Sequence, residues 1–106
     1  MGMDLRGPGG YFGLNWAGWR KALDFAEDNG WVAAGTRAPW LIQPRENPEK
    51  WSGTYLTNDY QQVTDADAEA IAAAIESGLS KVTDEDWKQT LKELIDYCRA
   101  GGFLIG

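Results

Sequence analysis

Two short acidic stretches have the composition of a site that could bind a metal or move a proton. VTDADA occupies residues 63–68, and VTDEDW repeats its plan at residues 82–87. In each stretch a threonine precedes closely spaced carboxylates. Clustered carboxylates bind hard cations such as Ca²⁺, and a pair of them can hydrolyse sugars. The first question is therefore whether these stretches are sites or only the starts of helices.

The residues within both stretches favour helix starts. Thr64 can accept a backbone N–H as an N-cap, and Asp67 stands three positions later, close to the capping-box arrangement. Thr83 and Asp86 repeat this spacing in the second stretch. An EF-hand calcium loop needs a glycine that TDADAEA lacks. Capping accounts for every residue of both motifs and a metal accounts only for the acids, so we predict capping and no metal.

Other catalytic chemistry is limited by the residue types that are absent. The chain of 106 residues has no histidine, which removes the commonest general base and the commonest metal ligand. Its single cysteine, Cys98, cannot form a zinc site or a redox pair. Cys98 falls on the apolar stripe of a predicted helix, which indicates a buried thiol. No nucleotide-binding glycine motif is present, and we expect no cofactor.

One aspartate remains as a candidate for an enzyme that uses carboxylates. Asp59 stands near Tyr55 and Tyr60 and outside the predicted helix starts. The pair Asn58-Asp59 is also typical of a turn, because both residues tolerate positive φ. We favour the turn, so the sequence indicates that the protein is not an enzyme.

The aromatic residues between positions 31 and 60 allow a binding site. Aromatic rings beside amide and carboxylate groups can stack on sugars or flat metabolites. Large rings can equally form the core of a small domain, which is the interpretation we favour. The alternative is a ligand site built from Trp40, Trp51, Tyr55, Asp59 and Tyr60.

The charge of the chain bears on its partners. The net charge is −6, and residues 64–106 contribute −5 of it through four Lys or Arg and nine Asp or Glu. Such a surface repels nucleic-acid phosphates and anionic lipid, so we expect neither nucleic-acid binding nor membrane docking. A basic protein partner is favoured instead. The single cysteine and the lack of a secretory segment predict a cytoplasmic protein, whose oligomeric state stays open.

Helical periodicity appears in three segments. The first spans about 16–29, capped by Asn15 and ended by Gly30, with an apolar face of Trp16, Trp19, Leu23 and Ala26. The second spans about 65–79 and the third about 84–100, where Trp87 opens the apolar face. Each has apolar residues three or four positions apart, as expected of a helix with one buried face.

The remaining segments predict a small β element. A hairpin is expected within 53–63, turning at Asn58-Asp59, and 31–36 could add a short strand. The C-terminal residues 103–105 are too apolar for a free tail, so we expect them to form an edge strand or to cover the core. Residues 1–10 are rich in glycine and are expected to be flexible. The prediction is one α+β domain over 11–106, mostly helical, with three helices and a short sheet or hairpin around a Trp-rich core.

The order of several motifs resembles a family of small bacterial proteins to which no activity is assigned. The motifs are NWAGWRKAL, then GW followed by GT, then W-x-G-x-Y-x-x-ND, VTDADAEAIAAAI and CRAGGF-x-I, and the similarity covers about residues 12–105. The resemblance implies a bacterial or phage origin and carries no activity with it.

Three functional hypotheses follow from these observations. The first is a non-catalytic protein-binding module, of the immunity or inhibitor type, that meets a basic partner. The second is a domain that binds a carbohydrate or another small ligand through residues 31–60. The third is an enzyme that uses carboxylates. The uneven negative charge favours the first of them.

Overall fold

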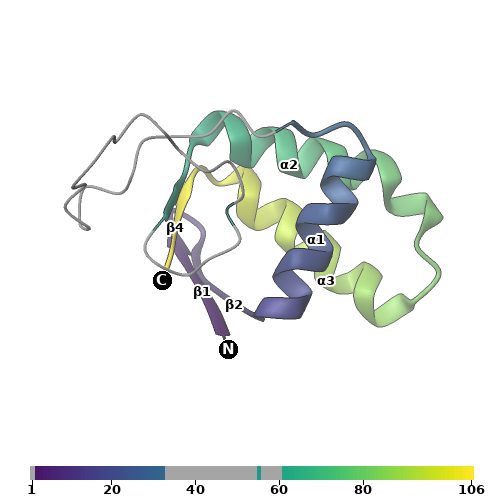
Figure 1. The fold of residues 1–106 in the computed structure, drawn as a ribbon, viewed down its shortest axis with the longest axis horizontal. Helices are drawn as coiled ribbons and strands as arrows, with labels where there is room; N and C mark the ends of the chain where they lie inside the picture. Colours follow the sequence, from purple (N-terminus) through teal and green to yellow (C-terminus); the bar gives the residue numbers. More distant parts are fainter. Residues whose placement is uncertain (1, 33–54, 56–60) are drawn as a thin grey trace.

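The computed structural model describes residues 2–32, 55 and 61–106. In this part of the chain a four-stranded antiparallel sheet, in the order β2-β1-β4-β3, lies beside three helices (Figure 1). The fold is therefore α+β and mostly helical, as the sequence predicted. The elements are β1 (Gly2–Gly7), β2 (Gly10–Asn15), α1 (Trp16–Asp28), β3 (Gln61–Val63), α2 (Asp65–Gly78), the 3₁₀ turn η1 (Leu79–Lys81), α3 (Glu85–Arg99) and β4 (Phe103–Ile105).

The expectation that residues 1–10 are flexible is wrong for the described residues, because Gly2–Gly7 forms a strand inside the sheet. Met3 and Leu5 are fully buried and alternate with the more exposed Asp4 and Arg6. This is the period of two that buries one face of a strand. β1 pairs along its whole length with β2, from Gly2 opposite Asn15 to Gly7 opposite Gly10. The glycines around Met3 and Leu5 make this short alternation difficult to recognise in the sequence.

The C-terminal strand occupies a more central position than predicted. β4 lies between β1 and β3, so it is an inner strand and not an edge strand. Phe103 and Ile105 are buried, and the ring of Phe103 meets the ring of Trp19 edge to face at 6.0 Å. β4 therefore pairs with the N-terminal hairpin and packs against α1 through Phe103. Close packing here excludes a larger residue at Gly102, because an added Cβ would collide with the backbone oxygen of Val63.

The other predicted β segments are described only in part. Gln61–Val63 forms β3, whereas the remainder of the predicted hairpin, apart from Tyr55, lies outside the described residues. Trp31 and Val32 have no strand conformation, and residues 33–36 are also outside the described part.

The predicted limits of the first helix are close to those observed. Asn15 caps α1 by accepting a hydrogen bond from the Gly18 N–H at 2.6 Å. Gly30 follows the helix with a φ of +106°, the left-handed conformation that glycine adopts without strain. One residue of the predicted apolar face is not buried: Trp16 is 39% exposed, and the buried face is Trp19, Ala22, Leu23 and Ala26. Trp16 opens the helix, ahead of the turns that pack on the core.

The two acidic stretches both begin helices. Thr64 caps α2 and accepts a hydrogen bond from the Asp67 N–H at 3.0 Å, as predicted. The prediction for the third helix is wrong by one residue, because Asp84 and not Thr83 is its N-cap. The Asp84 carboxylate accepts from the backbone N–H groups of Asp86 and Trp87. An aspartate is as good an N-cap as threonine, so composition alone did not choose between these neighbours.

A pair of substitutions tests this assignment. We expect Asp84→Ala to lower the free energy of unfolding by about 1 kcal/mol, because two backbone N–H groups lose their acceptor. Thr83→Ala is the control and is expected to change it by less than about 0.5 kcal/mol. Urea denaturation followed by circular dichroism measures both. A larger loss for Thr83→Ala than for Asp84→Ala would contradict the observed cap.

The single thiol lies in the core. Cys98 is 1% exposed on the inner face of α3, as predicted from its place on the apolar stripe. Burial raises the pKa of the Cys98 thiol to about 12. Burial likewise raises the pKa of Tyr97 to about 12.

These two groups predict a loss of stability at alkaline pH. The folded chain keeps both groups protonated beyond the pH at which an unfolded cysteine, near 8.5, and an unfolded tyrosine, near 10, lose their protons. Their stabilising effect is therefore complete below about pH 8.5 and is lost as the pH rises toward 12, by up to about 1.4 kcal/mol per pH unit per group. Denaturation curves from pH 7 to 11 measure the effect. A Cys98→Ala variant should show a smaller decline than the wild-type chain between about pH 8.5 and 10, and an unchanged decline there would disprove the cause given.

Candidate functional site

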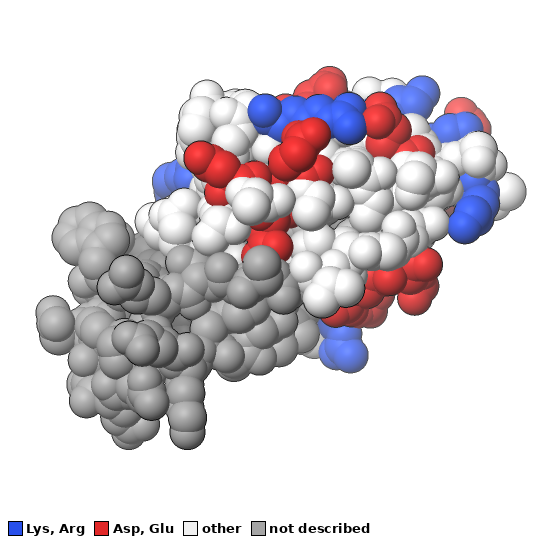
Figure 2. Space-filling view, turned by 90° about the horizontal axis from the view of Figure 1, so that it is seen from above, with Lys and Arg blue, Asp and Glu red and all other residues white. Residues whose placement is uncertain are grey.

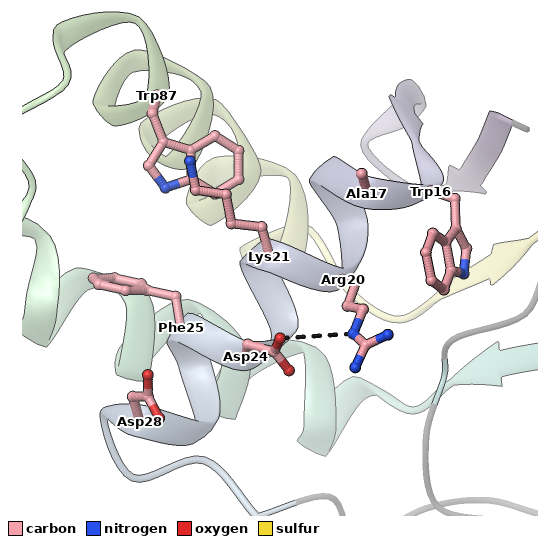
Figure 3. Close-up of a pocket in the computed structure, with 8 residues that line it drawn as sticks. All are labelled: Trp16, Ala17, Arg20, Lys21, Asp24, Phe25, Asp28 and Trp87. Carbon is pink, nitrogen blue, oxygen red and sulfur yellow. Dashed lines mark ion pairs between the residues drawn. The ribbon is translucent and has the colours of Figure 1, made fainter.

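A groove on the outer side of α1 combines aromatic and charged groups. It has a volume of about 380 Å³ (Figure 3). Seven residues of α1 and one of α3 line it, namely Trp16, Ala17, Arg20, Lys21, Asp24, Phe25, Asp28 and Trp87. Two helices that are distant in the sequence therefore contribute to one surface.

Helix periodicity explains why these residues share a face. The core side of α1 carries Trp19, Ala22, Leu23 and Ala26. Ala17, Arg20 or Lys21, Asp24 and Asp28 recur every three or four positions between them, so they project from the other side. Figure 3 shows the Trp16 ring at one flank of this side, with Phe25 and Trp87 at the other. The helix face is thus bordered by indole rings.

Both cations of the groove contact other side chains of the protein. The Arg20 guanidinium lies 5.6 Å from the centre of the Trp16 ring, and its Nε is 3.8 Å from Asp24 Oδ2. The Lys21 ammonium lies 4.4 Å above the Trp87 ring. Cations over indole faces are attracted by the ring quadrupole, which holds them beside the rings. The two indole rings of the groove therefore already contact cations of α1.

Several nearby carboxylates have no cation of their own. Glu27, Asp28, Glu85 and Asp86 form no ion pair with any residue that the structure describes. Glu27 and Asp28 belong to the last turn of α1, whereas Glu85 and Asp86 precede Trp87 in the first turn of α3. Of these four acids, Asp28 alone lines the groove, whose lining also includes the cations Arg20 and Lys21.

The face formed by α2 and α3 also carries paired charges. Arg99 of α3 donates two hydrogen bonds to the Glu76 carboxylate of α2, at 2.8 and 3.1 Å, and lies 3.7 Å from Glu69. The hydrogen bonds from Arg99 lower the pKa of Glu76. Figure 2 shows cationic and acidic side chains side by side on this face.

A buried carboxylate forms a second polar cluster. Asp67 is 2% exposed and accepts a hydrogen bond from the Tyr55 hydroxyl at 2.8 Å, with a longer one from the Trp31 indole at 3.4 Å. The rings of Trp31 and Tyr55 stack with centres 6.3 Å apart. The Tyr55 backbone oxygen accepts from the Trp19 indole at 2.7 Å. These contacts satisfy buried polar groups, and we interpret the cluster as structural.

The predicted ligand site is described at one position only. Tyr55 is fully buried in the cluster around Asp67, where its hydroxyl is committed to that carboxylate. The other four residues of that site, Trp40, Trp51, Asp59 and Tyr60, lie outside the described residues.

The described residues give little support for other kinds of site. They include no group of three or more acidic or cysteine side chains placed to hold a metal ion. Within the same part of the chain, no helix has the length and apolar character needed to cross a membrane. A second hollow lies between residues 29–32 and the α2 residues Ala70, Ala73, Ala74 and Ser77, and its lining has no charged side chain.

Comparisons with protein-family models, with curated proteins and with solved structures find no match. The functional argument therefore depends on the surface itself.

The sequence did not identify the groove. Trp16 and Trp87 were both assigned to buried helix faces, whereas Trp16 is 39% exposed and Trp87 is half-buried. A usable signal was present in α1, where Arg20, Asp24 and Asp28 follow Trp16 at helical spacing on the polar side. The contribution of α3 depends on tertiary packing and had no local signal.

Proposed function

We propose that the protein is a non-catalytic binding module that associates with a basic protein partner. The observation that carries this proposal is the set of exposed carboxylates without a cation at one end of the helical layer. Glu27 and Asp28 lie at the end of α1, and Glu85 and Asp86 at the start of α3. Among the ion pairs in which both residues are described, the acids are Asp24, Glu69 and Glu76.

Physical reasoning supports a charged partner more than a small substrate. Unneutralised carboxylates on one surface attract a basic protein over several ångströms and accelerate the encounter. The groove is open and mixed in polarity, which differs from the enclosed, mostly apolar pockets that hold small molecules. The proposal includes a role of the immunity or inhibitor type, in which the module covers a basic surface of its partner, and a location in the cytoplasm.

The test is capture of partners from the native host with the wild-type chain and with a charge-reversed variant. Glu85→Lys with Asp86→Lys reverses two exposed charges while Asp84 still caps α3. We expect a basic protein to be retained by the wild-type chain at low salt, and to be lost at high salt and with the variant. Asp96→Lys, a reversal near Arg99 at the far end of α3, is the control and should retain the partner. If the wild-type chain retains no basic protein, the proposal is wrong.

A further inference from the structure

One edge of the sheet is open along β2 (Figure 1). In the order β2-β1-β4-β3, β2 pairs with β1 on one side and with no described strand on the other. It spans six residues, Gly10–Asn15, whereas β3 at the opposite edge spans three, Gln61–Val63. An outer strand presents backbone N–H and C=O groups that can pair with a further strand.

The hydrogen bonds of β1 show which way its backbone groups point. Asp4 exchanges two backbone hydrogen bonds with Gly106, which follows β4, at 2.8 and 3.2 Å. The N–H and C=O groups of Asp4 therefore point toward β4. Because these directions alternate along a strand, the groups of Leu5 point toward β2, where Phe12 lies opposite. Leu5 and Phe12 are thus a hydrogen-bonded pair.

The two residues that flank Phe12 direct their backbone groups to the open edge. Tyr11 and Gly13 stand one position before and after Phe12, so their N–H and C=O groups point away from β1. Both residues are exposed. Among the described residues, neither has a backbone hydrogen-bond partner on that side. Four backbone groups of this edge are therefore available to another strand.

β2 lacks the features that keep edge strands from pairing, which are charged residues, prolines and β-bulges. Its sequence, GYFGLN, has no charge and no proline. It pairs residue for residue with β1, from Asn15 opposite Gly2 to Gly10 opposite Gly7, without a bulge. The chain as a whole has a net charge of −6, so two copies repel each other least where their edges are uncharged.

We propose that β2 of one copy pairs antiparallel with β2 of a second copy, so that two four-stranded sheets become one continuous sheet in a symmetric dimer. A two-fold axis beside Phe12 places Tyr11 of each copy opposite Gly13 of the other. In this register each Tyr11–Gly13 pair exchanges two N–H···O bonds. All four open backbone groups of each copy then have a partner.

The side chains of β2 are compatible with this register. The Tyr11 hydroxyl donates a hydrogen bond to Asp4 Oδ1 of β1 at 2.6 Å, so the ring leans away from the open edge. It lies over Gly13, where an added Cβ would stand 2.7 Å from the hydroxyl oxygen. On the other face of the sheet, Phe12 is partly buried against the core. The register brings the Phe12 residues of both copies together, which extends this apolar layer.

The first experiment measures the mass of the full chain by sedimentation velocity between about 10 μM and about 1 mM. A pair of six-residue strands is smaller than the interface of about 1,200 Å² found in stable complexes, so we expect a reversible dimer with a Kd of about 100 μM. An increase from about 0.05 to about 0.5 M salt should strengthen the dimer, because screening weakens the repulsion between two acidic chains. A mass that stays that of the monomer up to 1 mM would overturn the inference.

Two variants at one position test the role of the edge. Gly13→Pro removes the N–H that faces the open edge and keeps the pairing with β1, which an edge strand tolerates. Gly13→Ala is the control, because it adds a Cβ against the same Tyr11 hydroxyl and keeps the N–H. We expect the dimer to weaken at least about tenfold with proline, which removes two of its four bonds, and less than about threefold with alanine. Equal affinities of two variants that both have the circular dichroism of the wild-type chain would contradict the proposal.

Amide hydrogen exchange tests the same contact in the wild-type chain without a substitution. In the monomer the N–H groups of Phe12 and Leu14 are protected by β1, whereas those of Tyr11 and Gly13 face solvent. Between about 50 μM and about 1 mM chain, exchange at Tyr11 and Gly13 should slow about threefold, in proportion to the loss of monomer. A mass that doubles while exchange at Tyr11 and Gly13 stays constant would place the contact elsewhere and refute the β2 pairing.

This inference goes beyond the proposed function and does not depend on it. High salt is expected to strengthen the dimer and to weaken binding of a basic partner, so the two associations respond in opposite directions. Salt-sensitive capture of a basic protein by a chain that stays monomeric would refute the dimer alone. A dimer that captures no basic protein would refute the proposed function alone.

Discussion

Replacement of Asp67 by alanine is expected to lower the free energy of unfolding by about 3 kcal/mol. The variant leaves the Tyr55 hydroxyl and the Trp31 indole N–H in the core without the carboxylate that now accepts from them at 2.8 and 3.4 Å. A buried donor that loses its acceptor costs about 1–3 kcal/mol. Chemical denaturation followed by tryptophan fluorescence measures the change.

Two further variants separate burial from the general effect of removing an acid. Asp96→Ala makes the same substitution on an exposed surface of α3 and should change stability by less than about 0.5 kcal/mol. Asp67→Asn keeps one oxygen that can accept a hydrogen bond, so its effect should fall between the other two. An Asp67→Ala loss no larger than that of Asp96→Ala would mean that the buried cluster contributes nothing to stability.

Trp19→Ala should have the largest effect of any single truncation considered, about 4 kcal/mol. Trp19 is fully buried, its ring packs edge to face on Phe103 at 6.0 Å, and its indole N–H donates to the Tyr55 oxygen at 2.7 Å. Truncation of a buried Trp removes a large apolar area and leaves a cavity, which typically costs about 3–5 kcal/mol. Equilibrium denaturation in urea gives the value.

The same helix provides a matched control. Trp16 lies one turn earlier, is 39% exposed and borders the groove. Trp16→Ala should therefore cost less than about 1 kcal/mol. Comparable losses for both tryptophans would show that the assignment of core and surface on α1 is incorrect.

The two core predictions are coupled through one residue. Trp19 binds the backbone oxygen of Tyr55, and Asp67 accepts from its hydroxyl. Tyr55 also has a φ of +53°, an uncommon conformation for a residue with a side chain, so contacts from both ends are needed to hold it. Groups that share a partner are not additive. We therefore expect the double variant to lose less stability than the two single losses together.

The helices could be predicted from the sequence because their signals are local. Apolar residues recur every three or four positions in each, and Asn15 and Thr64 cap the first two as expected. The error at the third helix, Asp84 in place of Thr83, arises because two good capping residues are adjacent. Capping preferences locate the first residue of a helix to within a few positions, and tertiary packing determines which of these positions is the N-cap.

The sheet and the buried acid were harder to predict because their partners are distant. β1 has only Met3 and Leu5 as an apolar alternation, and it is stabilised by β4 at the other end of the chain. Asp67 has the local features of a capping acid, yet its side chain bonds to Trp31 and Tyr55. The spacing of residues along the sequence does not predict such long-range contacts.

The two candidate binding surfaces differ in how far the sequence could predict them. Of the predicted ligand site, the structure describes Tyr55 alone, and that ring belongs to the core. The groove combines exposed positions of α1 with Trp87 of α3, a combination that exists only after the two helices pack. Residue types suggested a basic partner, and folding placed Asp24 and Asp28 of α1 in the lining of the groove.

The most direct test of the binding-module account is the dissociation constant of the captured basic partner, measured with purified proteins at about 0.1 M and about 1 M salt. The Debye length falls from about 10 Å to about 3 Å across this range, which screens exposed charges. The account predicts that the wild-type complex weakens at least about tenfold, and that the Glu85→Lys/Asp86→Lys variant is weak already at low salt. Equal affinity at both salt concentrations, with the variant bound as tightly as the wild-type chain, would contradict it.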